Sequence, residues 1–97
     1  MKEFTAVVID PVGLHARPAT VAVNAASKCK CDVKVEYKQR SVNMKSIMGV
    51  MSLGVPVNAE IKITCNGEDE ENRIKEIKKT LEDNKVIAKE EATKEQA

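Results

Sequence analysis

Apolar and polar side chains alternate in two stretches of the chain, residues 31–38 and 60–66, as expected for strands with one buried face. Residues 2–9 are rich in β-branched side chains and stop at Asp10-Pro11, which also predicts a strand. Gln39-Arg40 follow the first alternating stretch and predict a turn into a partner strand that runs through Asn43, although no Asn-Gly or Asp-Gly marks the turn. The predicted inward positions of the alternating strands are Val33, Val35, Tyr37, Ile61, Ile63 and Cys65.

In the segments between and after these strands, apolar residues recur at the spacing of a helix. Small apolar side chains recur at positions 19, 22, 23 and 26 and predict a helix from Ala16 or Pro18 to Lys28. Residues 46–54 predict a short helix that opens with a serine and closes with a glycine. Acidic residues 68–71 lead into a last helix, which extends toward Lys85. The predicted inward side chains of that helix are Ile74, Ile77 and Leu81.

The order of elements is strand, helix, strand, strand, helix, strand, helix. Because the strands alternate, each has one face in water, and the helices must cover the other face. The predicted fold is therefore α+β, an open-faced β-sandwich with a four-stranded antiparallel sheet and three helices on one face. Residues 1–88 form the predicted domain, and residues 89–97 are a polar C-terminal extension.

Composition narrows the class of function. The 97 residues suit one domain, and although 32% are charged, the formal net charge is only +1. This balance argues against direct nucleic-acid binding, and 2% aromatic residues leave little for base stacking. The N-terminus does not have the pattern of a secretory signal, and no apolar run is long enough to insert in a membrane. We expect a cytoplasmic protein.

Three cysteines, Cys29, Cys31 and Cys65, are an odd number for a disulfide framework and indicate reduced thiols. The Cys-x-Cys pair could bind a soft metal, and with Cys65 and His15 the ligands would number four. One-residue spacing is weaker than Cys-x-x-Cys, so small apolar core residues are the favoured interpretation and we expect no metal site.

The segment DPVGLHARPAT, residues 10–20, contains the one histidine of the chain, His15, at the predicted start of a helix. The first N–H groups of a helix lack partners within it and can hold a dianion. Pro18 costs such a site little, because its missing N–H falls in the first turn. Gly13 allows the preceding loop to approach closely or to take a positive φ.

A phosphoryl group on a ring nitrogen of His15 would face the backbone amides of Ala16 and Arg17, and the Arg17 guanidinium could pair with its oxygens. A lone histidine beside an arginine is more often a surface residue without a task. The whole constellation Gly-Leu-His-Ala-Arg-Pro favours the phosphoryl group. The chain has no Walker-type loop, so we expect protein partners rather than a bound nucleotide, and no cofactor.

GLHARPAT and, at residues 43–54, NMKSIMGVMSLG resemble the HPr family, the histidine-containing phosphocarrier proteins of the phosphoenolpyruvate-dependent sugar phosphotransferase system. The resemblance covers residues 2–85. It implies that His15 is phosphorylated on Nδ1 by enzyme I and passes the phosphoryl group to enzyme II A components, with Arg17 pairing the phosphate. It also implies the same open-faced fold. Val12 departs from the Ser, Thr or Asn of many members and cannot donate a side-chain hydrogen bond.

Ser46 begins the second motif, and two interpretations of it stay open. It is a good helix N-cap in its own right. The segment KSIMGVMSLG also resembles the Gram-positive type of HPr, whose matching serine is phosphorylated by HPr kinase/phosphorylase. A phosphate there would add charge to a docking surface and hinder charging of His15.

The short helix carries more apolar side chains than it can bury, and Ile47, Met48 and Met51 are candidates for a partner surface. Core filling remains an alternative for each of them. The leading hypothesis is thus a monomeric phosphocarrier, not an enzyme. The alternatives are a regulatory module whose phospho-Ser46 binds a catabolite-control transcription factor, and a soft-metal binder.

Overall fold

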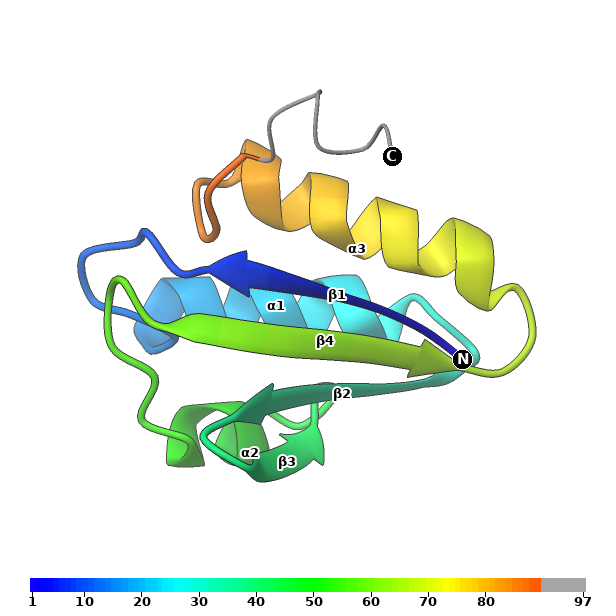
Figure 1. The fold of residues 1–97 in the computed structure, drawn as a ribbon, viewed down its shortest axis with the longest axis horizontal. Helices are drawn as coiled ribbons and strands as arrows, with labels where there is room; N and C mark the ends of the chain where they lie inside the picture. Colours follow the sequence, from blue (N-terminus) through cyan, green and yellow to red (C-terminus); the bar gives the residue numbers. More distant parts are fainter. Residues whose placement is uncertain (90–97) are drawn as a thin grey trace.

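The computed structural model describes residues 1–89, in which strands and helices follow the predicted order (Figure 1). The elements are β1 (Lys2–Val7), α1 (Ala16–Ser27), β2 (Asp32–Tyr37), β3 (Arg40–Asn43), α2 (Ile47–Ser52), β4 (Glu60–Asn66) and α3 (Glu70–Asp83). The predicted polar extension falls, except for its first residue, outside the described residues. Within residues 1–89, no helix has the length and apolar character needed to cross a membrane.

The four strands form one sheet in the order β1-β4-β2-β3, and every neighbouring pair is antiparallel. The central strand β4 pairs Ile61 with Ala6 of β1, and Ile63 with both Phe4 of β1 and Val35 of β2. The helices leave the other face of the sheet open (Figure 1). The predicted α+β open-faced sandwich with four antiparallel strands and three helices is therefore confirmed.

The core lies between the sheet and the helices, as the alternation predicts. All predicted inward positions of β2 and β4 are buried except Tyr37, which is partly buried, and Ile74, Ile77 and Leu81 of α3 are buried opposite them. Lys34 of β2 points to the open face and is exposed. Each strand thus keeps one dry and one wet face, which is what allows an antiparallel sheet to be covered on one side alone.

Helix α1 packs on the sheet through alanines, and it also contacts α2 and α3. Ala19, Ala22 and Ala26 are buried as predicted, but Val23 is partly exposed and Ala25 takes a buried place instead. Ala25 is buried because α1 contacts both α2 and α3, so its buried stripe extends beyond the face that packing on the sheet alone requires.

Strand β1 ends at Val7, two residues before the predicted end. Val8 instead forms an isolated bridge to Ile87, and the Ile9 N–H donates to the Val86 carbonyl at 2.9 Å. The chain after α3 therefore returns to β1 and buries Val86 and Ile87 in the core. This long-range pairing leaves no local pattern in the sequence.

The hairpin between β2 and β3 turns at Lys38 and Gln39, whose φ angles are +50° and +69°. Two consecutive positive φ values at the centre of a two-residue hairpin are the signature of a type I′ turn, which matches the twist of the strands. The predicted hairpin is confirmed, but its turn lies one residue earlier than the predicted Gln39-Arg40, because Arg40 already pairs with Tyr37 in the sheet. Neither central residue is a glycine or asparagine.

Candidate functional site: a histidine at the start of α1

His15 is the N-cap residue of α1, with extended backbone angles of φ −144° and ψ 160°. Its side chain is exposed and makes no capping hydrogen bond to the helix. Both nitrogens of the ring are therefore open to a partner that approaches this end of α1. The imidazole is neither sealed in the core nor used to hold the helix together.

The loop before His15 is fixed on both sides. The Asp10 carboxylate accepts a hydrogen bond from the Val12 N–H at 3.1 Å, and the Asp10 carbonyl accepts one from the Gly13 N–H at 2.9 Å. Leu14 is buried, and its N–H donates to the Val55 carbonyl at 2.9 Å. His15 is thus held between a closed turn and an anchored core residue, which limits the positions that its ring can take.

Gly13 is required by this anchoring. Its φ is +74°, and a Cβ atom at this position would lie 2.2 Å from the Val55 carbonyl oxygen. No side chain fits at such a distance, so only glycine permits the loop to cross the segment that follows α2. The sequence predicted either a close approach or a positive φ, and the structure has both.

Ala16, directly after His15, has a φ of +52°. An alanine in the left-handed region is strained, and such strain is retained where the surrounding structure imposes it, often at functional sites. As the first residues of α1, Ala16 and Arg17 have N–H groups without an acceptor one turn earlier in the helix, and Pro18 has no N–H at all. These two amides and the exposed Arg17 side chain make this end of the helix suited to an anion.

Ser46 is the N-cap of α2, as a serine at the start of this segment predicted. Its hydroxyl oxygen accepts a hydrogen bond from the Gly49 N–H at 3.1 Å. The residue before it, Lys45, donates from Nζ to the Cys29 carbonyl just after α1, at 2.8 Å, whereas the chain after α2 supports the His15 loop through Val55. Ser46 therefore starts α2 at the end that is remote from the His15 loop.

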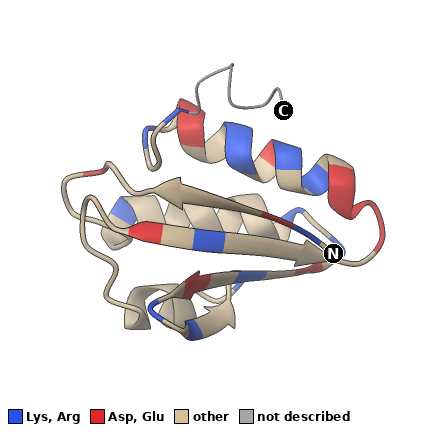
Figure 2. Ribbon diagram, in the orientation of Figure 1, with Lys and Arg blue, Asp and Glu red and all other residues tan. Residues whose placement is uncertain are grey.

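The predicted partner surface on α2 is partly exposed. Met48 is 78% exposed and Ile47 is 37% exposed, while Met51 is partly buried against the core. Helix α2 contains no charged residue, and Arg17 is the only charge within α1. Figure 2 shows this contrast with α3 and the strands, which carry charges of both signs. The neighbouring helices α1 and α2 thus present a weakly charged surface with one cation close to His15.

The three cysteines are free and buried, and their sulfur atoms all lie within 4.8 Å of one another. Burial raises the pKa of Cys65 to about 12 and also raises the pKa of Cys29. The notion that His15 completes a four-ligand set is wrong, because His15 and Cys29 stand at opposite ends of α1, whose 12 residues span about 18 Å.

Several supports of the site could not be found from sequence patterns. Asp10 closes the loop, the Val55 carbonyl accepts the hydrogen bond from the Leu14 N–H, and Lys45 ties the start of α2 to the end of α1. The Asp-Pro pair signalled a turn at Asp10, but nothing local indicated that Val55 would lie beneath the loop. By contrast, the order of His15, Ala16 and Arg17 at the start of a helix was readable directly.

Comparison with known families adds to this geometry. Residues 2–83 match the family described as the PTS HPr component phosphorylation site. The match covers most of the chain, including the His15 loop and both motifs. The chain belongs to the HPr family, the phosphocarriers of the sugar phosphotransferase system.

Solved structures agree with this assignment. The histidine-containing phosphocarrier protein of Mycoplasma is 38% identical with a TM-score of 0.86, covering 91% of this chain and 100% of its own. HPr from Thermoanaerobacter tengcongensis is 45% identical with a TM-score of 0.80, covering 84% and 92%. Crh of Bacillus subtilis, a catabolite repression protein seen as a domain-swapped dimer, is 35% identical with a TM-score of 0.66, covering 86% and 95%.

Proposed function

We propose that this chain carries a phosphoryl group on Nδ1 of His15, which it accepts from enzyme I and passes to sugar-specific enzyme II A components. The single observation that carries the proposal is an exposed imidazole at the N-terminus of α1 in a member of a phosphocarrier family. The protein is then a stoichiometric intermediate, charged and discharged by its partners, and not an enzyme that turns over a substrate alone.

In the charging step, the lone pair on Nδ1 of neutral His15 attacks phosphorus and a P–N bond forms. The bond between phosphorus and the donor group on enzyme I breaks, and its electron pair stays on that donor. The hydrogen on Nε2 remains on the ring. Discharge to an enzyme II A component is the same exchange with the acceptor as the nucleophile.

The backbone amides of Ala16 and Arg17 and the Arg17 guanidinium are the groups that we expect to hold the phosphoryl oxygens. The positive end of the α1 dipole favours a dianion there, and a guanidinium can form paired hydrogen bonds to phosphate. The Val12 N–H already donates a hydrogen bond to the Asp10 carboxylate. The valine side chain has no donor, so residue 12 adds no side-chain hydrogen bond to the phosphate.

Incubation of the full chain with phosphoenolpyruvate and enzyme I tests this proposal. Wild type should gain one acid-labile phosphate by mass spectrometry, and His15→Ala should gain none while it keeps the wild-type circular dichroism spectrum. Arg17→Ala should be charged at a lower rate. Equal labelling of wild type and His15→Ala would remove His15 from the role.

We further propose that Ser46 is a regulatory site for HPr kinase/phosphorylase. Phosphate at an N-cap is favoured by the helix dipole, and about two added negative charges would change the weakly charged α1–α2 surface on which partners dock. Since Ser46 lies at the end of α2 remote from the His15 loop, the effect should act on docking. Enzyme I should charge Ser46→Asp more slowly than wild type, whereas the neutral variant Ser46→Asn should be charged at the wild-type rate.

A second candidate function is a regulatory module, supported by the 35% identity to the catabolite repression protein Crh. In that case phospho-Ser46 would create a surface for a catabolite-control transcription factor, independently of His15. Binding of that factor by Ser46-phosphorylated His15→Ala, as tight as by Ser46-phosphorylated wild type, would support it. If neither phosphorylated form binds the factor, the phosphocarrier function is the remaining candidate.

The partner surface, comprising Ile47, Met48 and Met51, should contact both enzyme I and the enzyme II A components. Flexible methionine side chains suit a surface that fits several partners. We expect the protein to be a monomer in solution, although one solved HPr from Thermoanaerobacter tengcongensis and the Crh structure are dimers. Sedimentation equilibrium should give the 10.7 kDa mass of one chain.

A further inference from the structure

We propose that Cys29, Cys31 and Cys65 form a three-thiolate binding site for one Cu(I) ion. The three sulfur atoms lie within 4.8 Å of one another, and Sγ of Cys31 is 3.5 Å from Sγ of Cys65. All three residues are buried and none is in a disulfide. The site is independent of the proposed phosphocarrier function.

The sulfur spacing suits a single metal ion. With metal–sulfur bonds of about 2.3 Å, three ligands around a trigonal ion lie about 4.0 Å from one another. The spacing of the cysteines brackets this value, from 3.5 Å for Cys31 and Cys65 to the 4.8 Å limit of the group. Shifts of a fraction of an ångström would therefore bring all three sulfurs into coordination.

Three separate features of the fold bring the sulfurs together. Cys65 lies on β4 opposite Val33, and Cys31 precedes Val33 by two residues, so both side chains point from the sheet into the core. Cys29 follows α1, where Lys45 holds its carbonyl. Gly67 leaves room beside Cys31, because a Cβ atom there would lie 2.9 Å from the Cys31 Cβ.

The ligand set selects the metal. Thiolate sulfur favours soft ions such as Cu(I) and Zn²⁺, but structural zinc sites are four-coordinate. No fourth His, Cys, Asp or Glu within residues 1–89 joins the three cysteines. His15, the residue that could have completed a zinc site, stands at the far end of α1. Cu(I), which is satisfied by three sulfurs, is the better match.

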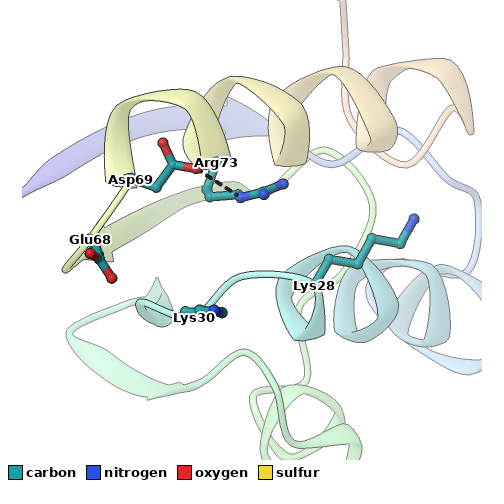
Figure 3. A pocket seen from close by; sticks show the side chains of 5 residues that line it. All are labelled: Lys28, Lys30, Glu68, Asp69 and Arg73. Carbon is teal, nitrogen blue, oxygen red and sulfur yellow. Dashed lines mark ion pairs between the residues drawn. The ribbon is translucent and has the colours of Figure 1, made fainter.

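Basic residues near Cys29 offset part of the charge that a loaded site would carry. The three thiols release their protons to solvent when the ion binds, so three thiolates and one Cu(I) ion leave a net charge of −2. A pocket of about 420 Å³ next to the cluster is lined by Lys28, Lys30 and Arg73 together with Glu68 and Asp69 (Figure 3). Lys28 and Lys30 flank Cys29 in the chain, and the Arg73 charge acts on Cys29.

The charged side chains of this pocket come from two sides of it. Figure 3 shows the acidic side chains of Glu68 and Asp69 on the α3 side of the pocket and Lys28 and Lys30 on the α1 side. Arg73 already pairs with Asp69 at 3.3 Å and with Glu76 at 2.6 Å. Lys28 and Lys30 form no ion pair with an acid among residues 1–89, which leaves their charges to act on a loaded site.

Titration of the reduced full chain with Cu(I), under argon and against a Cu(I) chelator of known affinity, tests the site. We expect one copper per chain by native mass spectrometry, and X-ray absorption should show three sulfur neighbours at about 2.3 Å. Zn²⁺ added at the same concentration should not displace it. A folded, reduced wild-type chain that leaves all copper on the chelator would overturn the proposal.

Single variants Cys29→Ser, Cys31→Ser and Cys65→Ser should each weaken Cu(I) binding by about 100-fold or more, since each removes a ligand and not merely an outer neighbour. His15→Ala and Met48→Ala, which remove the exposed imidazole and thioether, should bind as wild type. Circular dichroism identifies any variant that does not fold, and Cys→Ala then replaces it. Copper binding that survives all three serine variants, or a product two hydrogens lighter without metal, contradicts the site.

Discussion

At the scale of single residues, the site depends on backbone positions more than on side-chain contacts. His15 makes no capping bond, and its place is set by Gly13, Leu14 and the strained Ala16. The hydrogen bond from Leu14 to Val55 crosses from the loop to the segment after α2. The position of the imidazole therefore depends on how closely two distant parts of the chain approach at Gly13.

Gly13→Ala should lower the free energy of unfolding by about 3 kcal/mol or more. The left-handed φ alone costs an alanine about 1–2 kcal/mol, and the added Cβ would overlap the Val55 carbonyl oxygen, so the loop must also move. Because the loop carries His15, charging by enzyme I should slow as well. Urea unfolding and the phosphorylation rate measure the two effects.

Gly54→Ala is the matched control. Gly54 also has a positive φ, of +62°, but a Cβ atom there meets nothing within 4 Å. It should show the left-handed cost of about 1–2 kcal/mol without the steric part and leave the charging rate unchanged. Equal losses of stability in the two variants would mean that contact with Val55 has no influence.

At the scale of elements, the residues at the helix starts help to decide where each helix forms. Helix α2 has six residues and is too short to be stable by itself, so its N-cap and its packing on α1 decide whether it forms. Helix α3 begins with acidic residues, as the dipole favours, and its inward side chains follow the predicted spacing. Both starts can be tested separately from the core.

Ser46→Ala should lower the free energy of unfolding by about 1 kcal/mol, because the Gly49 N–H loses its acceptor. Ser46→Asn should match wild type, since asparagine caps as well as serine. Thermal or urea unfolding measures both. An alanine variant as stable as wild type would show that packing on α1 alone holds α2.

Glu70 makes the stability of the start of α3 depend on pH. Its carboxylate pairs with the Met1 ammonium group at 2.8 Å and accepts a hydrogen bond from the Gly67 N–H at 2.9 Å, and these contacts lower its pKa below the ordinary 4.5. The folded state thus favours the charged form. The resulting stabilisation is complete above pH 4.5 and disappears as the pH falls through the lowered pKa.

Glu70→Gln should therefore be less stable than wild type near pH 7, and the difference should vanish at acidic pH, measured by urea unfolding across the pH range. Glu71→Gln removes a charge from the same first turn of α3. It should lose less stability, because the pairing with Met1 and Gly67 belongs to Glu70. A Glu70→Gln deficit that is constant with pH would contradict the assignment.

At the scale of the whole molecule, the surface has a charged part and a weakly charged, more apolar part. The open face of the sheet and α3 carry charges of both signs, while α1 and α2 present apolar side chains and Arg17 (Figure 2). An apolar surface next to an exposed imidazole is suited to brief contact with several proteins. We therefore propose that partners dock on the α1–α2 side.

Met48→Gln tests this placement. Because the Met48 side chain is 78% exposed, its replacement should change the free energy of unfolding by less than about 0.5 kcal/mol. Phosphoryl exchange with enzyme I should nevertheless slow several-fold, because apolar contact area is lost at the interface. Lys34→Gln, on the open face of the sheet, should keep the wild-type rate. Equal rates for all three proteins would move docking elsewhere.

Much of the fold was predictable because its signals are local. Alternation in residues 60–66 gave the bounds of β4, and a serine followed by apolar residues gave the start of α2. The end of β1 was predicted wrongly, since the pairing of Val8 and Ile9 with the chain after α3 replaces regular strand pairing. Such long-range pairs have no period along the sequence.

The sequence by itself determined the order of the elements, the buried face of each strand and the place of His15, Ala16 and Arg17 at a helix start, because hydrophobic period and capping act between near neighbours. Tertiary structure alone decided that Val55 lies under Gly13 and that His15 is remote from the cysteines. It also gathered Cys29, Cys31 and Cys65 into one cluster. These depend on how sheet and helices pack, and packing brings together residues that no local pattern relates.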